Sequence, residues 1–246
     1  MDEKFLKMLK YLRLYGLASN WEHYIEMAEK KSFSHLQLLK YVVEEEHRIK
    51  MESSRKLRLK RAKIPEILGM ETFPFDRQPK LNKSKMLGLY DSFTYMAKRQ
   101  NLIFIGPTGT GKTGLATAFL LQAINHGHSG RFILFPELIE TLYKSLADRS
   151  EAKLMKQFVS YDCLLIDEIG YVEVEPVQVG LFFTLMHKRH KEKTTLITSN
   201  LGFSQWTSFL KNDHLSAALI DRLTENSHVI NMKNCISLRP KLGQTQ

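Results

Sequence analysis

Hydrophobic positions follow two different patterns along the chain. In the first third, apolar side chains recur at spacings of three and four, as in Leu6, Leu9 and Leu12, which is typical of amphipathic helices. After residue 100, short apolar runs alternate with helical patterns, which predicts a parallel β-sheet covered by helices on both faces. The expected strands are residues 101–106, 131–135, 162–167, 194–200 and 228–232.

A stretch with two prolines and few apolar residues, 70–85, lies between these two patterns. Ahead of it, Ser34 and Gln37 have the spacing of a capping box, which predicts the start of a helix. Pro65 ends that helix or the linker that continues it. We therefore predict a small helical module at residues 1–66 and a main α/β domain at residues 67–246.

The most specific motif follows the first expected strand. Residues 106–113 have the spacing G-x-x-x-x-G-K-[ST] between an apolar run and a helical pattern, which is the context of a phosphate-binding P-loop. Glycines let backbone N–H groups turn towards phosphates, and the N-terminus of a helix favours an anion. We expect Lys112 to reach the β- and γ-phosphates and Thr113 to bind Mg²⁺. The residues expected to bind nucleotide are Gly106, Pro107, Thr108, Gly109, Thr110, Gly111, Lys112, Thr113 and Gly114.

Two acidic residues end the third expected strand. Asp167 follows a continuous apolar run, and ligands of parallel sheets bind at the carboxyl ends of the strands. We therefore expect Asp167 to hold Mg²⁺, directly or through water. Glu168 comes next, and its carboxylate can polarise the water that attacks the γ-phosphate. The alternative is that Glu168 caps the following turn.

Two further polar residues are candidates for catalysis. Asn200 ends the fourth expected strand, where an amide can orient the attacking water or contact the γ-phosphate, although Ser-Asn is also a common turn. Arg222 follows the apolar run 217–220, where it is well placed to point into a neighbouring subunit and stabilise the transferring phosphoryl group. A local ion pair with Asp221 or Glu225 is the alternative for Arg222.

These motifs together resemble one known family. The stretches GPTGTGKT, LLIDEIGY, TTLITSN and FSQWTSFLKNDHLSAALIDRL are similar to those of the IstB family of AAA+ ATPases, transposition helpers encoded by bacterial insertion sequences. The resemblance covers most of the chain, and DnaC-type helicase loaders share most of the motifs. It implies a P-loop NTPase of the AAA+, ASCE type that uses ATP and Mg²⁺. By resemblance, the Walker A role falls to Lys112 and Thr113 and the Walker B role to Asp167 and Glu168.

The resemblance also gives Asn200 the sensor-one role and Arg222 that of an arginine finger acting in trans. Near the family's second sensor a Ser-Tyr-Arg-like element is common. Here that region reads NCISLRP, and Arg239 is the residue that could substitute. Only about fourteen residues follow the last expected strand, too few for the helical lid of many AAA+ modules. We therefore expect a neighbouring subunit of a homo-oligomer to enclose the nucleotide.

Charge indicates the kind of partner. The chain carries 36 Lys and Arg against 26 Asp and Glu, a net charge of +10, which favours nucleic acid first and an anionic membrane surface second. A basic protein that binds neither is the third interpretation. Clustered basic residues with few aromatics between them fit the backbone of duplex DNA, whereas a solvated helix surface is the alternative. The candidate DNA contacts are Arg48, Lys50, Arg55, Lys56, Arg58, Lys60, Arg61, Lys144, Arg149, Lys153 and Lys156.

The sequence gives no sign of membrane insertion or export. No run approaches the roughly 18 to 20 apolar residues that span a bilayer, and the N-terminus lacks an apolar signal core. We therefore expect a cytoplasmic protein without a membrane span. Cys163 and Cys235 lie in apolar or strand-like runs without zinc-type spacing, as expected for buried, reduced thiols.

The leading hypothesis is an ATPase that oligomerises on duplex DNA and helps a transposase select or engage its target, with hydrolysis driving disassembly. The transposase comes from the resemblance alone. In this hypothesis residues 1–66 serve DNA or partner binding and oligomerisation. The alternatives are a DnaC-type replicative helicase loader and a non-catalytic adaptor gated by nucleotide.

Overall fold

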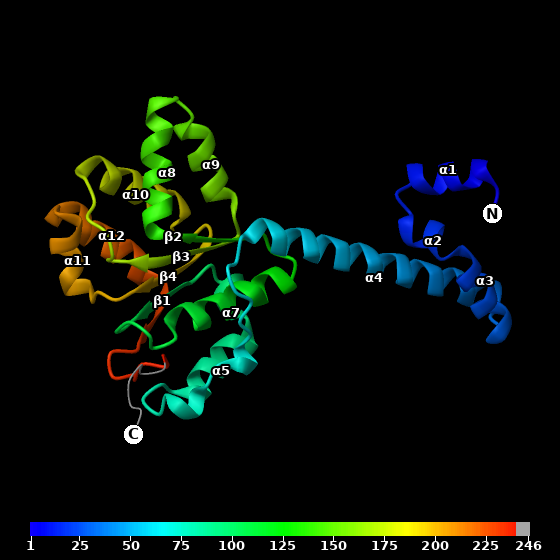
Figure 1. Cartoon of the computed structure of the whole chain (residues 1–246), viewed down its shortest axis with the longest axis horizontal. Coiled ribbons are helices and arrows are strands. Elements are labelled where there is room, and N and C mark those ends of the chain that lie inside the picture. Colours follow the sequence, from blue (N-terminus) through cyan, green and yellow to red (C-terminus); the bar gives the residue numbers. More distant parts are fainter. Residues whose placement is uncertain (240–246) are drawn as a thin grey trace, which may run out of the picture. The chain divides into compact units, whose positions relative to one another are not determined.

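The computed structural model describes residues 1–239, apart from the side chain of Asp213, and contains two compact units (Figure 1). The first unit comprises Met1–Leu57 and the second begins at Arg58. Their boundary therefore falls within helix α4 (His35–Ala62). The functional boundary at residues 66/67 stays a prediction.

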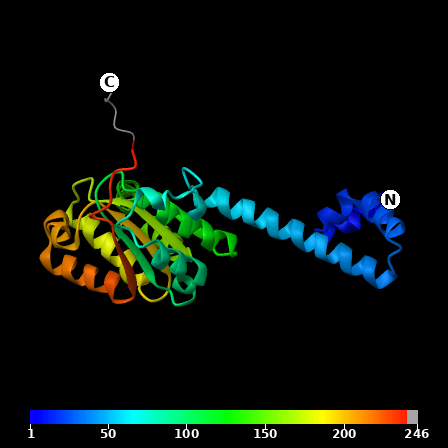
Figure 2. The ribbon, with the colours of Figure 1, turned by 90° about the horizontal axis from the view of Figure 1, so that it is seen from below.

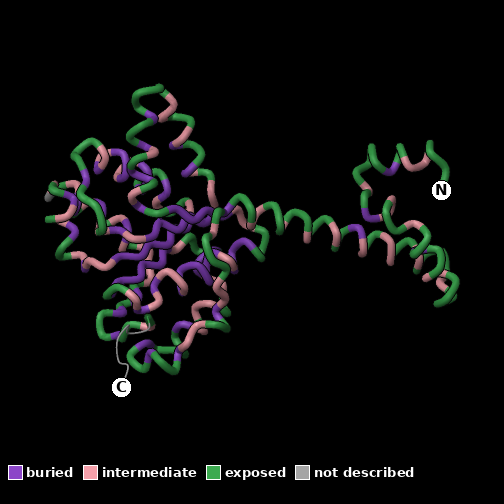
Figure 3. The backbone as a smooth tube through the Cα atoms, in the orientation of Figure 1, coloured by how far each residue is buried: buried purple, intermediate pink, exposed green. Residues whose placement is uncertain are grey.

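The first unit is helical. Its helices are α1 (Glu3–Tyr11), α2 (Tyr15–Ser19), α3 (Trp21–Lys30) and the first part of α4. The capping box predicted ahead of α4 is present, because the N–H of Ser34 donates to Oε1 of Gln37 at 2.8 Å and the N–H of Gln37 donates to Oγ of Ser34 at 3.3 Å. Much of the unit is exposed (Figure 3), and Leu9 and Tyr24 are among its buried residues.

The second unit contains the predicted parallel sheet. Its strands are β1 (Asn101–Ile105), β2 (Gly130–Leu134), β3 (Cys163–Ile169), β4 (Thr194–Ser199) and β5 (Ser227–Asn231). The strand order is β2-β3-β4-β1-β5 and every pair is parallel, so the five predicted strands are confirmed. Most of the predicted ends differ from these bounds by one or two residues. At one of them, Phe135 begins helix α8 (Phe135–Ala147), because Pro136 suits the first turn of a helix and cannot donate to a strand.

Helices cover both faces of the sheet (Figure 2). Side chains alternate along each strand, so that Leu102 and Phe104 of β1 pack in one core with helix α7 (Lys112–Asn125), whereas Ile103 and Ile105 pack in the core on the α8 face. The remaining elements are the 3₁₀ turns η1 (Met70–Thr72) and η2 (Phe75–Arg77) and the helices α5 (Lys83–Ser92), α6 (Thr94–Ala97), α9 (Glu151–Ser160), α10 (Pro176–Arg189), α11 (Phe203–Leu210) and α12 (Asp213–Glu225).

The strand order determines where the functional residues meet. β4 lies between β1 and β3, and all three run in the same direction. Polar groups at their carboxyl ends therefore gather at one edge of the sheet. After β5, residues 232–239 form no helix.

Two observations concern the rest of the described chain. Cys163 and Cys235 are buried and not in a disulfide, as predicted. None of the helices within residues 1–239 is long and apolar enough to cross a membrane.

Candidate active site

The P-loop connects β1 to α7, as the motif predicts. Gly109 has φ of 84° and Gly111 has φ of 94°, a region that residues with a Cβ rarely adopt. Gly111 is also the residue that precedes the first turn of α7, so free N–H groups of the helix face the loop. The loop and the helix dipole therefore form a site suited to phosphate.

The glycines of this loop also allow other segments of the chain to approach the loop closely, which the motif alone does not show. A Cβ on Gly106 would lie 2.7 Å from the backbone of Met232, and one on Gly109 would lie 2.4 Å from Oγ of Ser237. One on Gly111 would lie 2.6 Å from the ring of Phe73. Small residues are thus required here by the chain itself, because segments from before and after the sheet press against the loop.

Lys112 lies inside the loop. Its ammonium donates a hydrogen bond of 2.8 Å to the carbonyl of Pro107, and the residue is only 7% exposed. Burial lowers the pKa of Lys112, while the nearby carboxylates of Asp167 and Glu168 oppose that shift. The ammonium of Lys112 therefore lies close to the carboxylates of Asp167 and Glu168.

Thr113 and Asp167 meet as predicted. Oγ1 of Thr113 lies 3.0 Å and 3.1 Å from the two carboxylate oxygens of Asp167, and Asp167 is 2% exposed. Burial raises the pKa of this carboxyl, against hydrogen bonds from Thr198 and Thr113. A hydroxyl and a carboxylate at this spacing fit Mg²⁺, which prefers hard oxygen ligands and keeps several waters.

Glu168 lies on a bulge in β3. The pairing of β3 with β4 shifts register between Ile166 and Ile169, and Glu168 has φ of 65°. Such bulges redirect side chains and are common beside active sites. Glu168 consequently lines the pocket beside Lys112 instead of continuing the alternation of the strand.

Thr198 connects the two acids, and the sequence analysis missed it. Its hydroxyl donates to Oδ1 of Asp167 at 2.5 Å and accepts the N–H of Glu168 at 3.0 Å. The residue is buried near the end of β4 and also lines the pocket. The signal in the sequence that could have indicated Thr198 was a threonine within a run of residues expected to form a buried strand.

Asn200 lies beside the turn that follows Glu168. A Cβ on Gly170 would come within 2.5 Å of Oδ1 of Asn200, so the amide lies against the turn that follows Glu168. Oδ1 is buried and has no hydrogen-bond partner among the described residues. Asn200 is not among the residues that line the P-loop pocket, and its sensor-one role stays a prediction.

Arg222 is not brought to the P-loop of its own chain. The carbonyl of Arg222 bonds to Nδ1 of His190, which precedes β4, and the next carbonyl, of Leu223, accepts from Asn101 at the start of β1. Arg222 therefore lies at the amino edge of the sheet, opposite the nucleotide residues. Its guanidinium contacts His187 and lies 5.0 Å from the ring centre of Phe183.

The predicted alternative for Arg222, a local carboxylate partner, is not found. Glu225 pairs instead with Lys191 and with Nε2 of His190, and no described carboxylate forms an ion pair with Arg222.

The pocket at the P-loop has a volume of about 710 Å³. Besides the residues above, Arg239 lines it, so this arginine lies at the nucleotide site of its own chain. Tyr171 lines it too, and its hydroxyl lies 2.7 Å from that of Thr108. Neither the tyrosine nor its bond to the P-loop was predicted.

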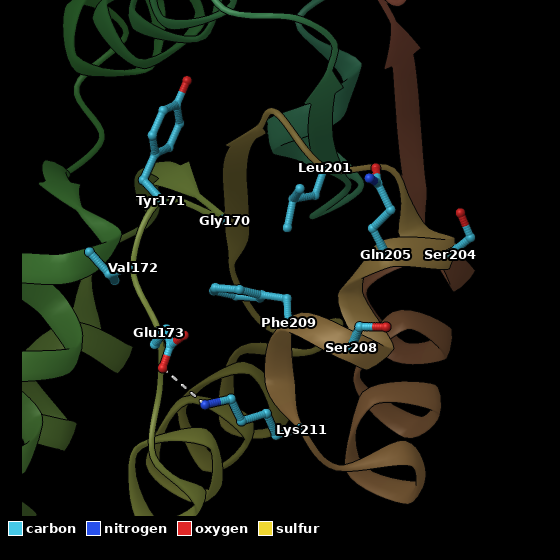
Figure 4. Close-up of a pocket in the computed structure, with 10 residues that line it drawn as sticks. All are labelled: Gly170, Tyr171, Val172, Glu173, Leu201, Ser204, Gln205, Ser208, Phe209 and Lys211. Carbon is cyan, nitrogen blue, oxygen red and sulfur yellow. Dashed lines mark hydrogen bonds and ion pairs between the residues drawn. The ribbon is translucent and has the colours of Figure 1, made fainter.

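A second pocket lies between the loop after β3 and α11 (Figure 4). Phe209 points into it, and an ion pair of 3.1 Å joins Glu173 to Lys211 at its rim. The hydroxyl end of Tyr171 points away from Phe209 and Lys211. With its charged pair already satisfied, this pocket lacks the reactive groups of the first.

The candidate DNA contacts are exposed or half-buried, and several are paired. Arg48 bonds to Glu45 at 2.7 Å and Arg55 to Glu52 at 2.9 Å, so carboxylates of α4 would compete with phosphates for these two arginines. On α9 the side chains of Lys153 and Lys156 are exposed and have no described partner. DNA binding by any of these residues stays a prediction.

Comparisons with known proteins show the family of the chain. A protein of insertion sequence IS21 from Pseudomonas aeruginosa, named as ATP-binding, is 30% identical over 92% of this chain and 85% of its own length. A protein of insertion sequence IS232 from Bacillus thuringiensis, also named as ATP-binding, is 27% identical over 91% of this chain and 89% of its own length.

Solved structures share the fold. The crystal structure of DnaI has a TM-score of 0.57 and 20% identity over 67% of this chain and 90% of its own. The structure of AMPPCP-bound DnaA from Aquifex aeolicus has a TM-score of 0.54 and 18% identity over 70% of this chain and 52% of its own. The model of the family described as IstB-like ATP binding protein matches residues 7–243. With the P-loop, the paired acids and these relatives in agreement, the chain belongs to the IstB-like ATP-binding proteins.

Proposed function

We propose that the chain is a Mg²⁺-dependent ATPase whose ATP-bound form assembles on duplex DNA and helps a transposase engage its target. The observation that carries the hydrolytic part is the convergence of Lys112, Thr113, Asp167 and Glu168 on one pocket. A protein that only held nucleotide would not need a carboxylate redirected into that pocket by a bulge.

Each residue has a separate task in this proposal. Lys112 balances phosphate charge from inside the loop, and Thr113 and Asp167 hold Mg²⁺, which neutralises phosphate oxygens. Glu168 accepts the proton of the attacking water. Thr198 fixes Glu168 through its backbone N–H, so that the carboxylate side chain remains available.

The proposal places Arg222 in the site of a neighbouring subunit. Its position at the opposite edge from its own P-loop supports this role, as does the lack of a carboxylate partner for Arg222 among the described residues. The aromatic ring of Phe183 holds the guanidinium by a cation–π contact without neutralising it. Asn200 is proposed to act beside Glu168, supported by its buried Oδ1, which has no hydrogen-bond partner in the described part of the chain.

The DNA and transposase parts rest on charge and relatives. A net charge of +10 favours a polyanion, and several relatives are named as proteins of insertion sequences. Exposed lysines of α9 would contact phosphates, and neutralising phosphates releases counterions without sequence preference.

The test uses a Glu168→Gln variant that binds ATP but does not hydrolyse it. Sedimentation and fluorescence anisotropy with a labelled duplex are measured with ATP, with ADP and without nucleotide. The proposal expects larger assemblies and tighter duplex binding with ATP alone. Equal assembly and equal affinity in all three conditions would contradict it.

The protein partner that the chain binds distinguishes the helicase-loader alternative from the proposed function. Pull-downs with the transposase of the same insertion sequence and with a replicative helicase are compared at equal concentrations. Retention of the helicase, and not of the transposase, would favour the loader.

A further inference from the structure

Gln78 is the most deeply buried polar residue of the linker ahead of α5. It is 1% exposed, directly after η2. Its Nε2 donates to the carbonyl of Thr110 in the P-loop at 3.1 Å and to the carbonyl of Ile236 at 2.6 Å. Its Oε1 accepts the N–H of Ile236 at 3.0 Å. One amide thus joins three distant parts of the chain.

The bond pattern matches the chemistry of an amide closely. The two hydrogens of Nε2 serve two carbonyls, while Oε1 serves the N–H of the same residue, Ile236, as a strand neighbour would. A glutamate cannot donate these bonds, and a methionine can make none of them. Because Gln78 and Thr110 are both buried, losing the amide leaves the carbonyl of Thr110 without this partner.

The segment fastened by Gln78 continues directly to the nucleotide pocket. The N–H of Met232 donates to the carbonyl of Ile105, and the N–H of Leu238 donates to the carbonyl of Gly109 at 2.8 Å. Arg239 follows and lines the pocket. Gln78 therefore holds the segment midway between its two other contacts with β1 and the P-loop.

Arg239 depends on this path for its position. Its Cδ lies 3.6 Å from the place that a Cβ on Gly109 would occupy, and its charge acts on the buried ammonium of Lys112. Arg239 itself is exposed, so few direct contacts fix the side chain. The segment's attachment to the P-loop is what brings the guanidinium to the pocket.

We propose that Gln78 is a positioning residue that fixes the P-loop carbonyl of Thr110 and docks residues 236–239, and thereby sets Arg239 against the bound nucleotide. The inference rests on the proposed nucleotide site and adds the residue that couples the linker to it. Gln78 has no contact with the nucleotide in this proposal, and acts through Thr110 and Arg239.

The test is a double-mutant cycle on nucleotide affinity. The dissociation constant of a fluorescent ATP analogue with Mg²⁺ is measured for the full chain and for Gln78→Met, Arg239→Ala and the double variant. Each single variant is expected to raise the dissociation constant by about tenfold. The double variant is expected to bind the analogue no more weakly than the single variant that binds it more weakly. Additive losses, or unchanged affinity of folded Gln78→Met, would overturn the proposal.

A matched control is available in Gln122, a second buried amide. It donates to the carbonyl of Tyr90 at 2.7 Å and accepts from the hydroxyl of Tyr95, away from the P-loop. Gln122→Met should lower the melting temperature without changing nucleotide affinity. Should Gln78→Met unfold, Gln78→Asn keeps the amide but is one methylene shorter, and the same loss of affinity is expected from it.

The readout separates this proposal from the ATPase proposal. If the wild type binds the analogue and does not hydrolyse ATP, the ATPase proposal fails while the cycle on affinity still decides the role of Gln78. If the wild type does not bind the analogue, both fail.

Discussion

The hydroxyl of Thr198 donates a hydrogen bond of 2.5 Å to Oδ1 of Asp167, across 31 residues of sequence. The hydroxyl oxygen of Thr198 also accepts the N–H of Glu168, so one side chain holds the proposed metal ligand and the proposed base in a fixed relation. Side chains that orient catalytic groups contribute strongly when those groups must stay within a fraction of an ångström of their working positions.

Replacement of Thr198 by valine should therefore lower kcat while nucleotide still binds. The shape is nearly conserved, but both hydrogen bonds are lost, and we expect kcat to fall by about 10- to 100-fold. Thr198→Ser keeps the hydroxyl and should retain most activity. Steady-state ATPase and analogue binding measure the two effects, and equal activity of the valine and serine variants would exclude the positioning role.

Lys112 and Glu168 should separate binding from hydrolysis. Lys112→Ala removes the buried ammonium that is proposed to bind the phosphates, so nucleotide affinity should fall by at least about tenfold. Glu168→Gln keeps the shape but cannot accept a proton, so affinity should be kept and hydrolysis should fall by about 100-fold or more. Calorimetric binding and phosphate release measure these effects. A Glu168→Gln variant that hydrolyses ATP at the wild-type rate would show that another group is the base.

Lys153 and Lys156 of α9 should contribute to duplex binding. The double variant Lys153→Glu/Lys156→Glu should weaken binding and reduce the slope of log affinity against log salt by about two. The matched control is Lys98→Glu/Lys188→Glu, which changes the net charge equally at two exposed lysines outside the candidate set. Titration of a labelled duplex at several salt concentrations checks this, and equal losses in both variants would mean that only net charge matters.

Asp162 should stabilise the fold at neutral pH. Burial alone would raise its pKa, but hydrogen bonds from Lys193 at 2.6 Å and from Ser129 at 2.7 Å outweigh burial and lower the pKa to about 2. The unfolded pKa is about 3.9. A lowered folded pKa means that the stabilisation is present above that unfolded value and is lost as pH falls towards about 2.

After allowance for partial exposure of the pair, Asp162→Asn should lower the free energy of unfolding by about 1 kcal/mol at pH 7, and the difference should shrink as pH falls and vanish only below about pH 2. Urea denaturation at several pH values measures it. Asp91→Asn, at an exposed site on α5, is the control. A difference between wild type and Asp162→Asn that does not depend on pH would contradict the ion-pair explanation.

Much of the fold could be predicted because buried parallel strands are continuous apolar runs, and the P-loop has a spacing of its own. β1, with all five residues buried, is such a run, and Lys112, Thr113 and Asp167 were found from motifs at strand ends. Thr198, Tyr171 and Gln78 could not be found in this way. Each is a single polar residue without periodicity, and the role proposed for Gln78 depends on a hydrogen bond to a residue 158 positions away.

The trans site is the central claim, and mixing two inactive variants tests it most directly. Glu168→Gln lacks the proposed base but supplies Arg222, whereas Arg222→Ala keeps Glu168 and lacks the proposed arginine finger. In a head-to-tail assembly of randomly mixed subunits, about one quarter of the sites pair an intact Glu168 with a neighbour's Arg222. The account predicts that the equimolar mixture, with ATP, Mg²⁺ and duplex DNA, recovers up to about a quarter of the wild-type ATPase rate. A mixture no more active than the average of the two variants alone would contradict it.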